Sequence, residues 1–136
     1  MDLFKTFKTD ESKEQDGVWV QLDDGKSRLK IARNLNARYR AAQQLKMQRY
    51  KMAAKVKTIP DDVWNDMFNE LIAETILVDW EGITKDGKPY PYSKENALEA
   101  IAELKDFREM VMGFAVDMDN FKQELDEGTE KNSVRP

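Results

Sequence analysis

Residues 77–97 read LVDWEGITKDGKPYPYSKENA and connect two helical patterns of the chain. The stretch contains large aromatic side chains, Trp80, Tyr90 and Tyr92, with an Asp-Gly turn signal between them. Loops run over the surface, and rings of this size are unfavourable in water unless they are covered. We therefore expect these side chains either to pack back on the core or to face a partner.

The segment before this loop has the strongest helical periodicity in the chain. Thr58 and Asp61 have the spacing of a capping box, and Pro60 suits a first helical turn, so we predict a helix over residues 60–78. Its apolar stripe is formed by Val63, Trp64, Met67, Phe68, Leu71, Ile72 and Ile76.

Two further helices are predicted after the loop. Ser93 can cap a helix over residues 94–105, and Asp106 with Glu109 forms a second candidate capping box before a helix over residues 107–125. Their apolar stripes are Ala97, Leu98, Ile101 and Leu104 in the first, and Phe107, Met110, Val111, Phe114, Met118, Phe121 and Leu125 in the second.

The N-terminal half predicts a hairpin followed by a basic helix. Apolar and polar residues alternate over residues 17–33 around an Asp-Gly turn signal, which is typical of two antiparallel strands. Residues 34–56 then suit a helix capped by Asn34 or Asn36. Its apolar stripe is thin and consists of Leu35, Tyr39, Ala42, Leu45 and Met52 or Ala53.

These elements predict a mainly α fold of about four helices with a small N-terminal β-hairpin packed on them. We expect a flexible N-terminal segment over residues 1–16, a single helical domain over residues 17–125 and a flexible C-terminal tail over residues 126–136. A chain of 136 residues is long enough for one modest core.

Composition excludes several kinds of chemistry. The chain has no Cys and no His, which removes disulfides, thiolate metal sites, cysteine nucleophiles and the commonest general base. The sequence contains neither a glycine-rich phosphate loop nor a G-x-S-x-G motif. It also has no apolar run of membrane-spanning length and no signal-peptide pattern. We expect a cytosolic, non-enzymatic protein without metal or cofactor.

Charge is strongly segregated along the chain. Residues 26–57 hold eleven Lys and Arg and no acid, whereas the remaining residues carry a net charge of −15. This division favours electrostatic docking, either within one molecule or between copies, although a solvated basic helix would give the same pattern. Nucleic acid is an alternative partner for the basic segment, but the acidic remainder would repel a phosphate backbone.

The candidate contact residues are side chains that have no obvious place in the core. Met47 lies off the apolar stripes, and Arg38 and Arg49 lie on the basic helix. Together with Trp80, Tyr90 and Tyr92 they form our predicted partner-binding set. We identify no catalytic and no metal-ligating residues.

The aromatic loop resembles the tail assembly chaperones of long-tailed bacteriophages and prophages. In that family a helix ends in an apolar-Asp-Trp-Glu-Gly run, a polar Asp-Gly turn follows, and Pro-Tyr-Ser opens the next helix. The resemblance extends from residue 17 to residue 121. The matching loop residues here are Val78, Asp79, Trp80, Glu81, Gly82, Asp86, Gly87, Pro89, Tyr90, Pro91, Tyr92, Ser93, Asn96 and Ala97.

The resemblance implies a helical assembly factor made in the host bacterial cytoplasm and absent from the mature virion. Such proteins bind the tape measure protein, keep it soluble, help to recruit tail tube subunits and self-associate into spiral or ring-like arrays. Two alternatives stay open: a head-tail connector or tail completion protein that the virion retains, and a nucleic-acid-binding regulator that uses the basic helix.

Overall fold

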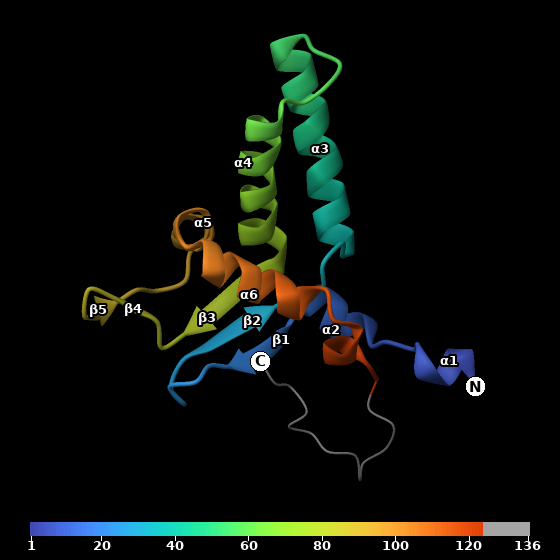
Figure 1. The fold of residues 1–136 in the computed structure, drawn as a ribbon, viewed down its shortest axis with the longest axis vertical. Coiled ribbons are helices and arrows are strands. Elements are labelled where there is room, and N and C mark those ends of the chain that lie inside the picture. The colour runs from blue at the N-terminus through green and yellow to red at the C-terminus, as the bar shows by residue number, and fades with distance from the viewer. Residues whose placement is uncertain (124–136) are drawn as a thin grey trace.

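Three antiparallel strands form the sheet at the centre of the molecule (Figure 1). The computed structural model describes residues 1–123, so the C-terminal tail expected over residues 126–136 lies outside the described residues. The strand order is β1-β2-β3, and Leu29 in the central strand lies opposite Val20 on one side and Trp80 on the other. The strands are β1 (Val18–Gln21), β2 (Arg28–Ile31) and β3 (Leu77–Glu81).

Alternation along β1 and β2 gives the sheet one buried face and one wetter face. Val18, Val20, Leu29 and Ile31 are all buried, as the period of two predicts. On the opposite face the Arg28 guanidinium lies 4.0 Å from the centre of the Trp19 ring. The predicted hairpin is therefore present and turns its apolar side towards the core.

The third strand was not expected. The helix predicted up to residue 78 stops earlier: α4 (Asp61–Leu71) continues as a π-helical segment, η1 (Ile72–Ile76), and then enters β3 without a loop. The Thr75 hydroxyl donates to the Leu71 carbonyl oxygen at 2.7 Å within this segment. β3 completes the hydrogen bonds of the free edge of β2, which an isolated hairpin would leave to water.

The expected fold class is therefore wrong. The described residues contain six α-helices, a three-stranded sheet and a two-stranded sheet, which is an α+β arrangement rather than a mainly α one. The second sheet pairs β4 (Thr84–Lys85) with β5 (Lys88–Pro89) inside the aromatic loop. Asp86 and Gly87 both have positive φ values, 53° and 78°, which suit a two-residue hairpin turn.

Two short helices lie in the N-terminal segment that we expected to be flexible. They are α1 (Leu3–Thr6) and α2 (Glu11–Asp16), and their N-caps are Asp2 and Asp10. The Asp10 amide donates to the Phe121 carbonyl oxygen at 2.7 Å, which attaches the start of α2 to the C-terminal part of the described chain. Asp10 stands before the polar residues of α2 and is a capping signal for a helix there. The low apolar content of the segment led us to predict a flexible chain instead.

Two long helices, α3 (Ala37–Ala54) and α4, form a hairpin that stands away from the sheet (Figure 1). Asn36 caps α3 by accepting from the Tyr39 amide, which confirms one of the two predicted caps. The N-cap of α4 is Pro60, which has no side-chain cap bond, so the predicted Thr58–Asp61 capping box is wrong. We call α3 and α4 together the helical arm.

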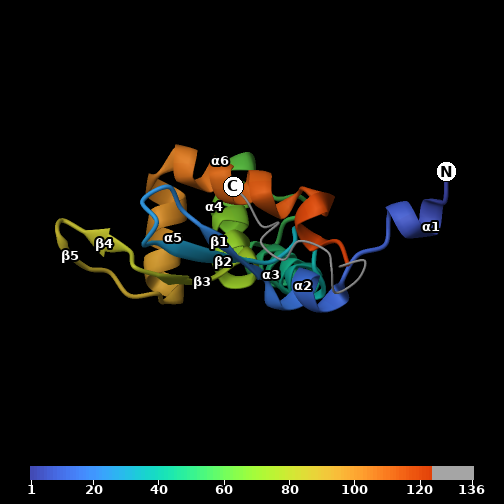
Figure 2. The ribbon, with the colours of Figure 1, turned by 90° about the horizontal axis from the view of Figure 1, so that it is seen from below.

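The C-terminal helices cover the buried face of the sheet (Figure 2). Val20 and Ile31 of the sheet line a small cavity together with Phe114 of α6. Ser93 caps α5 as predicted. The N-cap of α6 is Leu104, which makes no side-chain cap bond, so the Asp106–Glu109 capping box is wrong. These elements are α5 (Lys94–Glu103), α6 (Lys105–Ala115) and a final 3-10 turn, η2 (Met118–Phe121).

Candidate functional site

The three aromatic side chains singled out in the loop form one cluster. Tyr90 stacks on Trp80 with ring centroids 5.6 Å apart, and Tyr92 meets Trp80 edge-on at 5.4 Å. Trp80 projects from β3 and is only 5% exposed, while both tyrosines are partly buried. The aromatic loop therefore packs back on the core, which was one of its two expected fates.

Hydrogen bonds fix the geometry of this cluster. The indole Nε1–H of Trp80 donates to the Tyr90 carbonyl oxygen at 2.7 Å, and the Tyr92 hydroxyl donates to the Leu77 carbonyl oxygen at 2.8 Å. Burial raises the pKa of the Tyr92 phenol. The outer part of the loop is held by Glu99, which accepts from the Tyr90 hydroxyl and pairs with Lys85 at 2.7 Å. That contact with Glu99 raises the pKa of Tyr90.

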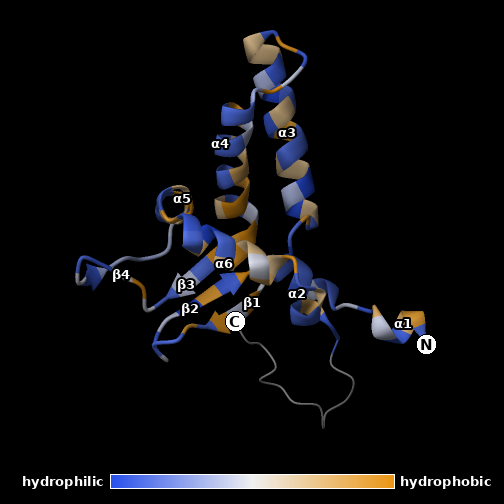
Figure 3. Ribbon diagram, viewed as in Figure 1, coloured by the Kyte–Doolittle hydropathy of each residue, from blue (hydrophilic) through white to orange (hydrophobic). Residues whose placement is uncertain are grey.

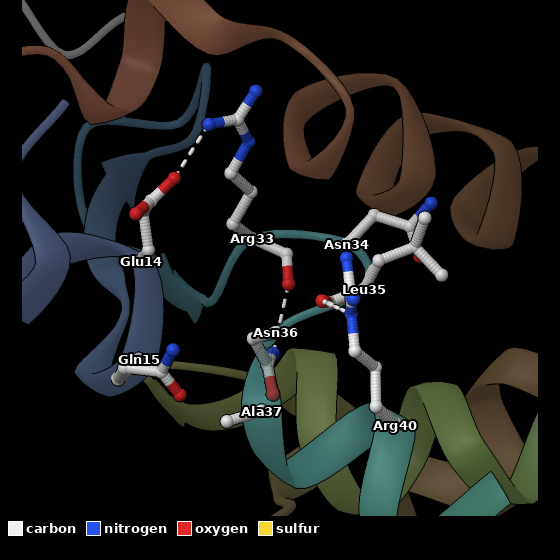
Figure 4. Close-up of a pocket in the computed structure, with 8 residues that line it drawn as sticks. All are labelled: Glu14, Gln15, Arg33, Asn34, Leu35, Asn36, Ala37 and Arg40. Atoms are coloured by element: carbon white, nitrogen blue, oxygen red, sulfur yellow. Dashed lines mark hydrogen bonds and ion pairs between the residues drawn. The ribbon is translucent and has the colours of Figure 1, made fainter. Parts of the chain in front are cut away.

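The root of the helical arm is similarly restrained, as Figure 4 shows. Asn36 Nδ2 donates to the carbonyl oxygens of Arg33 and Thr75 at 2.8 and 3.0 Å. The Arg33 guanidinium pairs with Glu14 of α2, and Arg40 Nε donates to the Leu35 carbonyl oxygen at 2.8 Å. These side chains line an open cavity of about 480 Å³. Asn36, Arg33, Glu14 and Arg40 use their side chains in these bonds, whereas Asn34 Oδ1, which also lines the cavity, is buried without a hydrogen-bond partner among the described residues. Because most of the bonded side chains hold the start of the helix, we interpret the cavity as the anchorage of α3.

The side of α3 that faces α4 uses part of the basic charge internally. Lys46 Nζ lies 3.1 Å from Glu70 and 2.8 Å from Glu74. Burial alone would lower the pKa of Lys46, but the hydrogen bonds to Glu74 and Glu70 raise it above its usual value. Met47, the next residue, is partly buried and packs against the core, so it is not the exposed contact residue that we predicted.

The opposite side of α3 is exposed and carries both predicted arginines. Arg38 and Arg49 are exposed, although Arg38 Nη2 donates to the Gln15 carbonyl oxygen at 2.6 Å. Leu45, between the two arginines, and Met52, beyond them, are 45% and 71% exposed. Their spacing places them on one helical face. Leu45 and Met52 were assigned to the buried stripe in the sequence, and that assignment is wrong. We call this face the outer stripe: Arg38, Ala41, Leu45, Arg49 and Met52.

The outer stripe combines exposed apolar area with uncompensated positive charge. No ion pair involves Arg38 or Arg49 within residues 1–123. Figure 3 shows α3 in blue and pale tan along its length, whereas strong orange gathers where α4 approaches the sheet. An exposed face of mixed apolar and cationic side chains on a rigid helix can receive another helix whose stripe is apolar and whose flanks are acidic.

Within residues 1–123, no three His, Cys, Asp or Glu side chains come together in a way that could hold a metal ion. None of the helices in that part of the chain has the length and hydrophobicity to cross a membrane.

Comparison with known proteins gives one match. A family model described as YdaY prophage protein matches residues 34–132, which run from the entry into α3 past the end of the described residues. No curated protein and no solved structure matches this chain. The matched span contains the helical arm, the aromatic cluster, α5 and α6, and it covers most of the sequence. The chain is therefore a prophage protein and belongs to the YdaY prophage protein family.

Proposed function

We propose that this prophage protein is a tail assembly chaperone that binds the tape measure protein, keeps it soluble and helps to recruit tail tube subunits in the host cytoplasm. It does so by contact and without catalysis. Membership of a prophage family supports a role in making phage particles. The resemblance to tail assembly chaperones supports the more specific assignment.

The residues that carry this resemblance have a common structural task. Trp80, Tyr90 and Tyr92 build the aromatic cluster, and Asn96 Nδ2 ties α5 to the loop by donating to the Pro91 carbonyl oxygen at 2.8 Å. Most of these side chains therefore hold the loop in place. This structural task does not identify the contact surface.

The observation that carries the proposal is the outer stripe. A tape measure protein, as the resemblance describes it, is a long helical chain with apolar stripes that aggregate when bare. Leu45 and Met52 offer exposed apolar contacts, and Arg38 and Arg49 attract acidic residues beside a client's stripe. The arm stands clear of the sheet, so a long helix has access to it (Figure 1).

The test is co-expression with the tape measure protein encoded nearby, followed by pull-down. The wild-type chain should retain soluble tape measure protein, and the double variant Leu45→Glu with Met52→Glu should lose it to the pellet. The matched control adds the same charge to exposed positions of α3 off the stripe, Gln44→Glu with Ala54→Glu, and should retain the client. An insoluble client with the wild-type chain would contradict the proposal itself.

Equal retention by both double variants would instead remove the outer stripe as the client surface. The head-tail connector alternative differs in fate, because a connector stays in the particle. Mass spectrometry of purified virions should find this chain absent, and its presence in stoichiometric amounts would favour the connector. A salt-dependent shift of plain duplex DNA that is lost in Arg38→Glu with Arg49→Glu would favour the nucleic-acid alternative.

A further inference from the structure

The N-terminal residues carry large apolar side chains that the molecule does not cover. Leu3, Phe4 and Phe7 are 58%, 86% and 54% exposed, on or beside α1. Both views show α1 standing apart from the other elements (Figures 1 and 2). Lys5 and Lys8 interleave with the rings. We call residues 1–8 the Phe4 segment, and its chemistry is that of an aromatic and basic docking peptide.

A cavity of matching character opens between the aromatic loop and the α5–α6 corner. It has a volume of about 400 Å³, and its lining includes Trp80 and Tyr90 from the aromatic cluster and Leu104 and Phe107 from the α5–α6 corner. Leu22, Ile83 and Ala100 extend its apolar lining. We call it the Phe107 cavity.

Its size suits aromatic side chains. A closed cavity of about 150 Å³ is enough to hold a benzene molecule, so an open cavity of this volume has room for two phenyl rings. Phe4 and Phe7 are three positions apart, which puts them on the same side of a helical turn. The two rings can therefore enter together.

Charge around the cavity also favours this occupant. Its lining includes Glu99, Glu103 and Lys85, and Lys85 is already paired with Glu99. Within the described residues Glu103 forms no ion pair, so its carboxylate remains for an incoming cation. Lys5 or Lys8 beside the inserted rings supplies that cation.

The Phe4 segment of the same molecule does not reach this cavity. Thr9 is held by a bridge to Lys122, and the following Asp10 amide donates to Phe121. From Thr9 back to Phe4 a fully extended chain spans at most about 18 Å. In both views the sheet and α6 lie between α1 and the β4–β5 loop (Figures 1 and 2). The occupant must then come from another molecule.

We propose that the Phe107 cavity is a binding site for the Phe4 segment of a second copy of this chain. Phe4 and Phe7 fill the cavity, and Lys5 or Lys8 pairs with Glu103. The donor and acceptor surfaces are different, so each copy has one free segment and one free cavity, and the contact can propagate. This inference concerns contact between copies and does not rest on the proposed client.

The first experiment measures association of the full-length chain by sedimentation velocity over a concentration series. The wild-type chain should form dimers and larger species, and Phe4→Ser with Phe7→Ser should weaken association about tenfold or more, as truncation of buried anchors does. The matched control removes exposed apolar area elsewhere, Met110→Ser with Val116→Ser, and should associate like wild type. A monomeric wild-type chain, or unchanged association of the Phe4 and Phe7 variant, would overturn the proposal.

The second experiment identifies the acceptor site. A photo-reactive benzoyl-phenylalanine at position 4 is cross-linked in a mixture of isotopically light and heavy chains. Cross-links between light and heavy peptides should map to residues 99–107. Cross-links confined to chains of the same isotope, or directed to the outer stripe, would overturn it.

A third experiment tests the proposed charge pairing by reversing exposed charges, which leaves the core of the protein unchanged. Glu103→Lys alone and Lys5→Glu with Lys8→Glu alone should each weaken association, because both changes are at exposed positions of the proposed contact. Mixing the two variants should restore heterodimers, since reversed segments then meet reversed cavities. Failure of the mixture to associate better than either variant would contradict the charge pairing.

Discussion

The indole nitrogen of Trp80 donates a hydrogen bond of 2.7 Å to the backbone carbonyl oxygen of Tyr90, ten positions later in the chain. This bond closes the loop that contains the β4–β5 hairpin and brings the Tyr90 ring over Trp80. It joins the edge strand of the sheet to the loop that precedes α5. The Trp80 indole N–H thereby fixes the orientation of the aromatic loop.

Trp80→Phe should destabilise the protein by about 2 kcal/mol, because it removes a buried hydrogen bond and part of a packed ring. The Tyr90 carbonyl also loses its partner. Urea unfolding followed by circular dichroism measures the change. Trp19→Phe is the control, since that ring lies on the wetter face of the sheet and should lose less than about 1 kcal/mol. Equal losses of unfolding free energy in the two variants would show that the hydrogen bond of Trp80 does not contribute measurably to stability.

Asn36→Ala should cost about 2–3 kcal/mol, more than an ordinary helix cap. The side chain is buried, caps α3 through the Tyr39 amide and also donates to two carbonyl oxygens. Ser93→Ala removes only the cap bond of α5 and should cost about 1 kcal/mol. The free energies of unfolding from urea titrations decide this, and a smaller loss for Asn36→Ala than for Ser93→Ala would contradict it.

Gly82→Ala should be much more harmful than Gly87→Ala. Both glycines have positive φ, 76° and 78°, so each alanine adds backbone strain of about 1 kcal/mol. A Cβ on Gly82 would also lie 2.7 Å from the Lys26 carbonyl oxygen, whereas a Cβ on Gly87 meets nothing within 4 Å. We expect thermal unfolding of the Gly82 variant at clearly lower temperature. Equal unfolding midpoints for the two variants would contradict the prediction, because they would mean that the backbone at Lys26 can move away from the added Cβ at little cost.

The Asp24 carboxylate should make stability depend on pH in the acid range. The Ser27 hydroxyl, with the Ser27 and Lys26 amides, lowers the pKa of Asp24 from 3.8 to about 2. A carboxylate whose pKa is depressed on folding stabilises the protein above its unfolded pKa, and the contribution is lost as the pH falls towards the folded value.

The stability difference between wild type and Asp24→Asn should therefore be largest at neutral pH and shrink below about pH 4. Urea midpoints measured from neutral pH down to the acid limit test this. Asp23→Asn is the neighbouring control, because within residues 1–123 the Asp23 side chain makes no hydrogen bond, and its difference from wild type should stay small. If the stability difference between wild type and Asp24→Asn stayed constant with pH, the charge of the Asp24 carboxylate would not contribute to the stability of the folded loop.

Local patterns in the sequence were enough to predict several elements. The alternation of Val18 and Val20 with Trp19 predicts a strand with one buried face, because the side-chain period of a strand is two. Asn36 and Ser93 predict helix starts, because their side chains accept from amides a few positions on. The segregation of charge left docking within one molecule and docking between copies open, and the pairs of Lys46 with Glu70 and Glu74 are contacts of the first kind.

Local patterns in the sequence did not predict which side of α3 is exposed for contact. Leu45 and Met47 are both apolar residues of a basic helix, and the sequence assigned Leu45 to the core and Met47 to the surface. The structure reverses this: Met47 is partly buried against the core and Leu45 is 45% exposed. The rotation of α3 about its axis is set by Tyr39 at its root and by Lys46 facing α4, and a thin stripe does not specify it.

What the sequence determined by itself is therefore local: the hairpin with its buried face, a helix cap at Asn34 or Asn36, the cap at Ser93, and the grouping of bulky aromatics in one loop. What only the tertiary structure decided is which groups from distant segments meet. Residues 77–81 become a strand because the free edge of β2 is there to pair with them, and Trp80 is covered because Tyr90 returns over it. Such outcomes depend on partners far along the chain, whose positions are fixed by packing and not by local propensity.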